Sequence, residues 1–194
     1  MTATRGKTIG PRTTRAELGA LVCRALAAID DEPVLVGGAV VSIYSDGRFV
    51  SDDLDFVSWR DDKRRRPAME ALGFHKRGSY FIHPDTELFV QFVNPPVMIG
   101  HKHVREPARL PTRAGELRIL SPLDCVLDRL AWHLERGDAQ TLEQAIDVAR
   151  THRVPLDAID RWLAVEDWPA DRKELLLESL GRRLAEPRPR KPRR

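Results

Sequence analysis

The sequence predicts an α+β fold, with short strands in the first two thirds of its 194 residues and helices in the last third. An apolar strand, Val34–Val36, is followed by Gly37-Gly38, a short helix and a second strand, Asp53–Val57. Further short β-type runs, separated by turn residues, follow between residues 74 and 93. From residue 121 onward, four segments repeat apolar residues at helical spacing across short connections, which predicts packed helices.

A helix precedes the first strand. Thr14 and Glu17 form a capping-box pattern at its start, and Pro33 prevents it from continuing much beyond residues 30–31. After the strand, Gly37 and Gly38 allow a sharp turn and close approach to a ligand. When the two glycines are considered alone, a tight strand–helix turn with no ligand explains them better.

The second strand carries the most informative pair of residues. Asp53 and Asp55 alternate with Leu54 and Phe56, so both carboxylates face one side while the apolar residues face the core. Two neighbouring carboxylates repel each other unless a cation lies between them. Mg²⁺ in phosphate-handling sites takes one or two carboxylates together with substrate phosphates. The pattern therefore predicts that Asp53 and Asp55 bind Mg²⁺ or Mn²⁺.

The middle of the chain predicts a helix and three more strands. The helix lies within residues 61–72 and is expected to begin near Arg66, because Pro67 fits best in a first turn. Its three arginines, residues 64–66, are either a solvated face or a clamp on a triphosphate or RNA. Strands are expected at residues 74–77, 79–83 and 87–93; residues 94–96 should end the sheet, and residues 116–120 should form an edge strand.

The last third predicts helices with clear boundaries. Ser121 and Asp124 form a capping pattern, Gly137 and Asp138 separate the first two helices, and Pro155 starts a third. A fourth covers residues 170–184. Polar residues of these helices are either cleft residues or ordinary surface charges and caps: Asp128, Arg129, His133 and Asp138.

Charge is concentrated at the two ends. Residues 1–16 carry +4 and residues 182–194 carry +6, which leaves −7 on residues 17–181 for a total of +3. We expect residues 1–13 to be a disordered basic arm and residues 186–194 a basic Pro/Arg tail. Such ends either bind RNA electrostatically or are simply solvated. The sequence has no signal-peptide or membrane-spanning pattern, and Cys23 and Cys125 lie in apolar patterns, so we expect a cytoplasmic protein with buried, reduced cysteines.

Gly37-Gly38, the short helix, and Ser51-x-Asp53-x-Asp55 resemble the signature of nucleotidyltransferases of the polymerase-beta type. The nearest resemblance is to small bacterial members, including minimal nucleotidyltransferases and AbiEii-type toxins. It implies a mixed sheet flanked by helices in a core of residues 14–120, followed by a helical domain over residues 121–185. It also implies a nucleoside triphosphate near Gly37, Gly38 and Ser51, and Mg²⁺ or Mn²⁺ on Asp53 and Asp55.

One position departs from the family pattern. The third carboxylate of this fold normally lies in the strand beside the aspartate pair, and the matching residue here is Gln91, with Glu87 on the same face as the alternative. A neutral amide cannot act as a general base. Three functions therefore stay open. One is transfer of a nucleoside monophosphate to a hydroxyl of RNA, such as tRNA, of protein or of a small molecule. The second is an impaired relative that binds nucleotide or a protein partner, as in toxin–antitoxin-like systems. RNA binding through the basic ends is a third.

Overall fold

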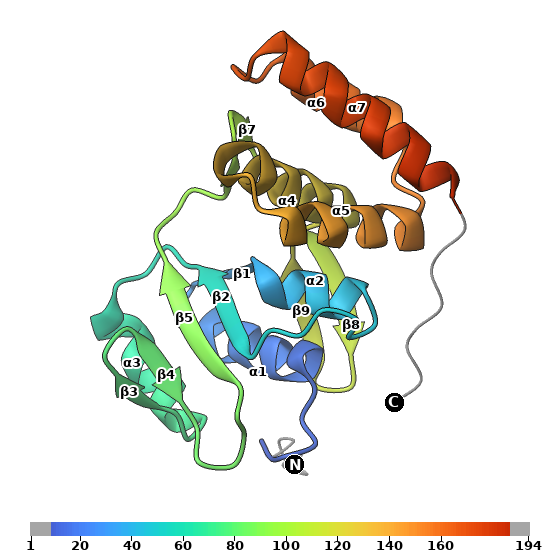
Figure 1. Ribbon diagram of the computed structural model, residues 1–194. Helices are drawn as coiled ribbons and strands as arrows, with labels where there is room; N and C mark the ends of the chain where they lie inside the picture. Colours follow the sequence, from blue (N-terminus) through green and yellow to red (C-terminus); the bar gives the residue numbers. More distant parts are fainter. Residues whose placement is uncertain (1–8, 187–194) are drawn as a thin grey trace. The chain divides into compact units, whose positions relative to one another are not determined.

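The computed structural model describes residues 9–186, and it confirms an α+β fold in which a mixed sheet is accompanied by helices and followed by a helical group (Figure 1). The chain forms two compact units, each assembled from three segments. The first contains residues up to 39, residues 51–95 and residues 108–119; the second contains residues 40–50, 96–107 and those from 120 onward. The two predicted basic arms lie mostly outside the described residues.

The first unit is built on one seven-stranded sheet with the order β3-β4-β5-β2-β1-β9-β8. Its strands are β1 (Val34–Val36), β2 (Asp53–Val57), β3 (His75–Arg77), β4 (Tyr80–Ile82), β5 (Phe89–Val93), β8 (Ala108–Thr112) and β9 (Gly115–Ile119). The pairs β2–β5 and β1–β9 are parallel, and the other neighbours are antiparallel. The predicted mixed sheet is therefore confirmed, with β2 near its centre.

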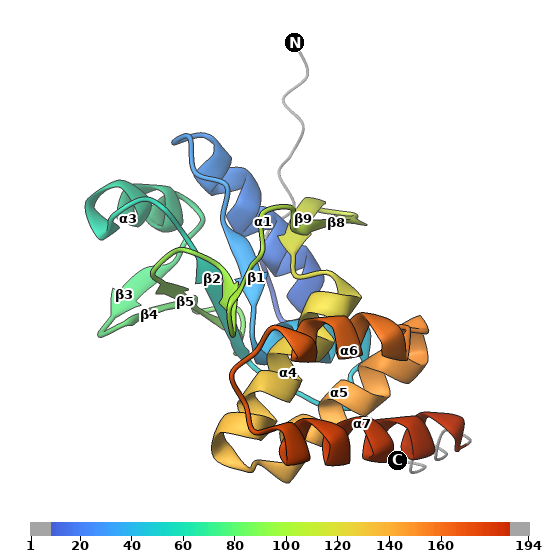
Figure 2. The ribbon, with the colours of Figure 1, turned by 90° about the horizontal axis from the view of Figure 1, so that it is seen from above.

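Helices α1 (Arg15–Ala27) and α3 (Asp62–Ala71) contact each other beside the sheet (Figure 2). Gly19 of α1 lies close to the Phe56 ring, and the Arg65 guanidinium of α3 lies 4.6 Å from the centroid of the Phe92 ring. Phe56 and Phe92 are paired across β2 and β5, so their side chains share a face. The two helices thus cover the face that carries the apolar core of this unit.

The second unit is mainly helical (Figure 1). Its elements are α2 (Gly38–Tyr44), whose first residues belong to the first unit, the strands β6 (Met98–Ile99) and β7 (Lys102–His103), and the helices α4 (Pro122–Arg136), α5 (Ala139–His152), α6 (Leu156–Ala164) and α7 (Ala170–Ala185). Ser121 caps α4, Gly137 ends it in the left-handed conformation, and Asp138 caps α5. These predicted boundaries are confirmed.

The start of α3 differs from the prediction. The helix begins at Asp62, not near Arg66, and it contains Pro67 in its interior. The Asp61 side chain accepts a hydrogen bond from the Arg64 N–H at 3.1 Å, which caps the earlier start. An ion pair of 2.8 Å between Arg65 and Asp62 supports the first turn. These local contacts outweigh the preference of proline for a first turn.

The sheet also extends further than predicted. Residues 94–96 do not end it, because β8 and β9 join it later in the chain. The strand expected at the edge is β9, which lies between β1 and β8, and the edge is β8 instead. The sequence did not predict β8 because it contains Pro111, which has no N–H to donate. An edge strand tolerates such a residue. Lys102 and His103 form β7 of a small hairpin with β6.

Candidate active site

Strand β2 places the two predicted carboxylates together. Leu54 and Phe56 are fully buried, whereas Asp53 and Asp55 are half-buried on the opposite face of the strand. This face is the one that α1 and α3 leave uncovered, because those helices pack against the Phe56 side. Residues two apart on a strand are spaced by about 7 Å along it and point to the same face, so a cation over this face lies within reach of both side chains.

One oxygen of the Asp53 carboxylate has no hydrogen-bond donor among the residues that the structure describes. Its Oδ1 is buried, and no donor within residues 9–186 lies in hydrogen-bond distance of it. Burial raises the pKa of Asp53 above the ordinary value of an aspartate. A buried carboxylate oxygen without a donor is costly for the folded protein. A bound cation would satisfy this oxygen and would favour the ionised form.

The Gly37-Gly38 turn lies directly against the acidic strand. Gly37 has φ of +73°, and a Cβ atom built on it would lie 2.9 Å from Asp55 Oδ2. A Cβ atom on Gly38 would lie 3.1 Å from Ser51 Oγ. A side chain at Gly37 would therefore be strained and would collide with the carboxylate. The turn brings backbone next to Asp55 and Ser51.

Ser51 lies at the mouth of β2, where its hydroxyl donates a hydrogen bond of 3.2 Å to the backbone carbonyl of Asp53. Arg15 of α1 fixes the same segment. Its Nε donates to the Ser51 carbonyl, and its Nη2 pairs with Asp52 Oδ1 at 2.7 Å. The Asp52 side chain is thus engaged by Arg15. The role of Arg15 was missed, because it is 36 residues from Ser51 and no local pattern signals it.

Gln91 lies beside Asp55. The parallel register of β2 and β5 pairs these two residues, and paired residues share a face of the sheet. Glu87, the alternative, precedes β5 and lines a separate cavity of about 660 Å³ together with Arg15 and Asp52. The residue next to the aspartate pair therefore bears an amide, not a carboxylate.

The donor set of this face suits a divalent cation held jointly with a substrate. Within residues 9–186, no group of three or more His, Cys, Asp or Glu side chains is placed to hold a metal ion. The face offers two carboxylates and the amide oxygen of Gln91. Mg²⁺ keeps several waters and is bound through one or two carboxylates plus substrate phosphates, so it fits this set. A fully protein-bound structural metal does not.

Two of the three arginines of α3 make contacts away from the carboxylate pair. Arg65 stacks on the Phe92 ring and pairs with Asp62, and Arg66 pairs with Glu70 at 2.7 Å. Phe92 faces the side opposite to Gln91, because the two are adjacent on β5. Arg65 therefore supports the core side of the sheet, away from the carboxylate pair.

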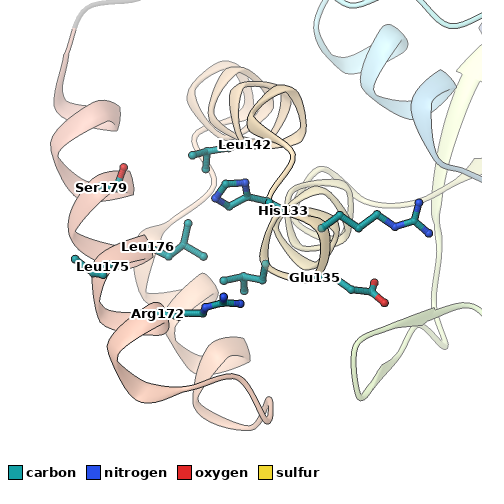
Figure 3. Close-up of a pocket in the computed structure, with 10 residues that line it drawn as sticks. His133, Glu135, Leu142, Arg172, Leu175, Leu176 and Ser179 are labelled. Carbon is teal, nitrogen blue, oxygen red and sulfur yellow. The ribbon is translucent and has the colours of Figure 1, made fainter.

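Polar residues of the helical unit act locally. Arg129 pairs with Asp128 at 2.5 Å, and His133 Nδ1 lies 2.8 Å from the Asp138 carbonyl. His133 also lines a cavity of about 490 Å³ between the α4–α5 junction and α7. Figure 3 shows it turned toward Leu142 and Leu176 there, while Glu135 points away. The Arg129 and Asp128 side chains are only 12% and 17% exposed, so they form a local, largely buried ion pair, and His133 contacts the cap residue Asp138. The leucines make this cavity apolar on one side.

Cys23 and Cys125 are free and buried, as expected from their apolar surroundings. Burial raises the pKa of the Cys23 thiol to about 11, and it raises the pKa of Cys125 further. Neither thiol is a nucleophile at neutral pH. Among the described helices, none combines the length and the apolar character that crossing a bilayer requires.

Neither a protein-family model nor a curated protein sequence matches this chain. Its structure is similar to that of an antigenic nucleotidyltransferase-like protein from Paracoccidioides brasiliensis, with a TM-score of 0.52, 12% identity, and coverage of 72% of this chain and 77% of that one. Weaker similarity, with a TM-score of 0.42 and 13% identity, extends to the antibiotic-resistance factor ANT(2'')-Ia over 89% of this chain and 94% of that one. The similarity to the structure of ANT(2'')-Ia in complex with adenylyl-2''-tobramycin has a TM-score of 0.41 and 14% identity, and it covers 89% of this chain and 100% of that one.

The similarity to the Paracoccidioides protein shows that this chain has a nucleotidyltransferase-type fold. The resemblance seen in the Gly-Gly and Asp-x-Asp pattern is therefore confirmed at the level of the fold.

Proposed function

We propose that this protein is a metal-dependent nucleotidyltransferase that moves a nucleoside monophosphate from a nucleoside triphosphate to a hydroxyl acceptor. The supporting observation is that two carboxylates and a glycine backbone lie next to each other on one face of the sheet. Asp53 and Asp55 lie side by side, the Gly37 backbone approaches Asp55, and Asp53 Oδ1 has no donor among the described residues. Phosphate chemistry needs such a place for a cation and for backbone contact with oxygens.

The ionised carboxylates of Asp53 and Asp55 would hold Mg²⁺ or Mn²⁺. When bound, the cation would neutralise the negative charge that gathers on the phosphate oxygens. The backbone of the Gly37-Gly38 turn runs close to Asp55 and Ser51 with no side chain of its own, and we assign the β- and γ-phosphates to the backbone N–H groups of this turn. The Ser51 hydroxyl is a further hydrogen-bonding group at the same strand end.

In the transfer step, the acceptor oxygen forms a bond to the α-phosphorus while the bond from that phosphorus to the pyrophosphate oxygen breaks. Pyrophosphate carries away the electron pair. The hydroxyl proton passes to water, because the Gln91 amide cannot accept it at neutral pH. Gln91 can still orient the acceptor by a hydrogen bond. We therefore expect slow turnover compared with an enzyme that has a carboxylate at this position.

A second function is supported by one observation, the pairing of Gln91 with Asp55. Without a general base, the same fold could bind nucleotide or a protein partner and catalyse nothing. This alternative, which includes a toxin–antitoxin-like role, predicts nucleotide binding without transfer.

The test is transfer of label from each α-labelled nucleoside triphosphate, with Mg²⁺ or Mn²⁺, to total tRNA or to the protein itself. We expect transfer that is lost in Asp53→Ala/Asp55→Ala and accelerated at least ten-fold in Gln91→Glu, which restores a base of the same size. Metal-dependent transfer by the double variant would contradict the proposal. Nucleotide binding by calorimetry, with no transfer by either wild type or Gln91→Glu, would favour the non-catalytic function.

A further inference from the structure

A row of side chains crosses the sheet on the face of the candidate site. The register pairs Arg77 with Tyr80, Tyr80 with Gln91, and Gln91 with Asp55. Residues that are paired across neighbouring strands point to the same face. With strands about 4.8 Å apart, the Tyr80 backbone lies about 10 Å from that of Asp55. The Arg77 guanidinium and the Tyr80 ring therefore lie on the same face of the sheet as the Asp55 carboxylate.

Phe89 adds a second ring to this surface. It is paired with Asp53 across β5 and β2, and its ring centroid lies 5.1 Å from that of Tyr80 in an edge-to-face arrangement. Tyr80 is 40% exposed, so part of its side chain is accessible to a ligand. Together with Arg77 and Ile82, the two rings line a cavity of about 500 Å³. This cavity is open, apolar at its walls, and has one guanidinium at its edge.

The position of this cavity relative to Asp55 indicates which substrate it suits. Gly37, which follows β1, lies against Asp55 on one side, whereas Tyr80 and Phe89 lie on β4 and β5 on the other side. In an in-line displacement, the attacking and leaving oxygens are on opposite sides of the phosphorus. If the leaving pyrophosphate lies at the Gly37-Gly38 turn, the acceptor hydroxyl enters from the side of β5 and β4.

We propose that Tyr80, Phe89 and Arg77 bind the 3′-terminal nucleotide of a single-stranded RNA acceptor. The base would stack on the aromatic pair, and a backbone phosphate would lie near Arg77. Stacking on aromatic side chains beside a positive charge is the usual way in which proteins hold single strands. The basic segments 1–16 and 182–194 add charge that attracts a polyanion. This inference rests on the proposed function for the side from which the acceptor enters.

The test measures binding of the full chain to a 5′-fluorescein-labelled single-stranded RNA of ten nucleotides by anisotropy, without nucleoside triphosphate or metal. We expect Tyr80→Ala to raise the dissociation constant at least five-fold and Tyr80→Phe to leave it within two-fold, because the phenylalanine ring still stacks. Arg77→Ala should weaken binding and reduce its salt dependence. An RNA whose 3′ nucleotide lacks its base should bind wild type and Tyr80→Ala equally.

Two matched controls come from the same unit. Trp59 is 52% exposed and Arg64 is exposed on α3, and neither lines the cavity. Trp59→Ala and Arg64→Ala should therefore bind the RNA as wild type does. Equal binding by Tyr80→Ala and wild type, or an equal loss in Trp59→Ala, would overturn the inference. Labelling of a protein acceptor that Tyr80→Ala does not affect, with no RNA binding, would also overturn it and indicate a protein substrate.

The binding assay separates this inference from the proposed function. Tyr80-dependent RNA binding with no label transfer by any variant would retain the RNA site and refute the transferase. Metal-dependent transfer to an acceptor other than RNA, with RNA binding insensitive to Tyr80, would retain the transferase and refute the RNA site. Asp53→Asn should abolish transfer and leave RNA binding unchanged, since Asp53 holds the cation and not the base.

Discussion

At the scale of single residues, the buried carboxylate of Asp53 is a source of instability as long as no cation is bound. Its Oδ1 has no donor within the described range, and burial raises its pKa. A raised pKa means that the ionised form is disfavoured in the folded state. The cost is fully present above the raised pKa and disappears once the pH falls below the ordinary value of an unfolded aspartate, about 3.9.

We therefore expect Asp53→Asn to stabilise the metal-free protein at pH 7, by on the order of 1 kcal/mol. The difference from wild type should shrink as the pH falls through the raised pKa toward 4. Saturating Mg²⁺ or Mn²⁺ should raise the melting temperature of wild type and not that of Asp53→Asn. Urea unfolding at several pH values, with and without the cation, measures both effects. Asp85→Asn, which removes an exposed carboxylate, is the control, and a destabilised Asp53→Asn would contradict the prediction.

The residues of the candidate site differ in how far the sequence could predict them. Asp53 and Asp55 follow from two-residue alternation in a strand, which is a local property. Gln91 could be proposed as their neighbour, but only the β2–β5 register places it beside Asp55. The exposed side of Tyr80 and the anchor provided by Arg15 depend on which strands and helices meet, so no local pattern contains them.

At the scale of elements, the turn between β1 and α2 carries a steric requirement. Gly37 and Gly47 have nearly the same backbone conformation, with φ of +73° and +69°. A Cβ atom at Gly37 would meet Asp55 Oδ2 at 2.9 Å, whereas at Gly47 it would meet no atom of the structure within 4 Å. Gly47→Ala thus reports backbone strain alone, and Gly37→Ala reports strain plus the collision.

We expect Gly47→Ala to cost about 1 kcal/mol of unfolding free energy and Gly37→Ala about 2–3 kcal/mol. Gly37→Ala should also displace the Asp55 carboxylate and abolish the increase in melting temperature that Mn²⁺ produces, while Gly47→Ala keeps it. Chemical denaturation and thermal scans with Mn²⁺ measure the two quantities. Equal costs for both variants, with the cation effect retained in both, would show that the turn does not press on Asp55.

Elements with strong local signals were predicted well, and the others were not. The caps at Ser121 and Asp138 and the left-handed Gly137 fix helix boundaries by contacts within a few residues. Strand β8 was missed because its Pro111 argues against a strand, and only its pairing with β9 at the sheet edge overrides that preference. Likewise β9 was expected at an edge, since its inner position depends on pairing with β1, far away in the sequence.

At the scale of the whole molecule, the chain passes between its two units several times. Residue 120 begins the last segment of the second unit, and residues 40–50 and 96–107 also belong to that unit. There the Tyr44 hydroxyl donates to the Leu120 carbonyl at 2.7 Å, and Lys102 pairs with the buried Asp124 at 2.5 Å. The C-terminal helices thus depend on earlier segments.

We therefore expect a fragment of residues 120–194 to lack cooperative unfolding. Without Lys102 the Asp124 carboxylate would be left without its charged partner, and without Ile99 the Trp162 indole N–H would lose the carbonyl that accepts its hydrogen bond. Near-ultraviolet circular dichroism of the tryptophans in this fragment should be weak and should recover when residues 1–119 are added. The full chain, cut only at residue 120, is the control. A sharp thermal transition of the isolated fragment would mean that its helices form a domain without the two earlier segments.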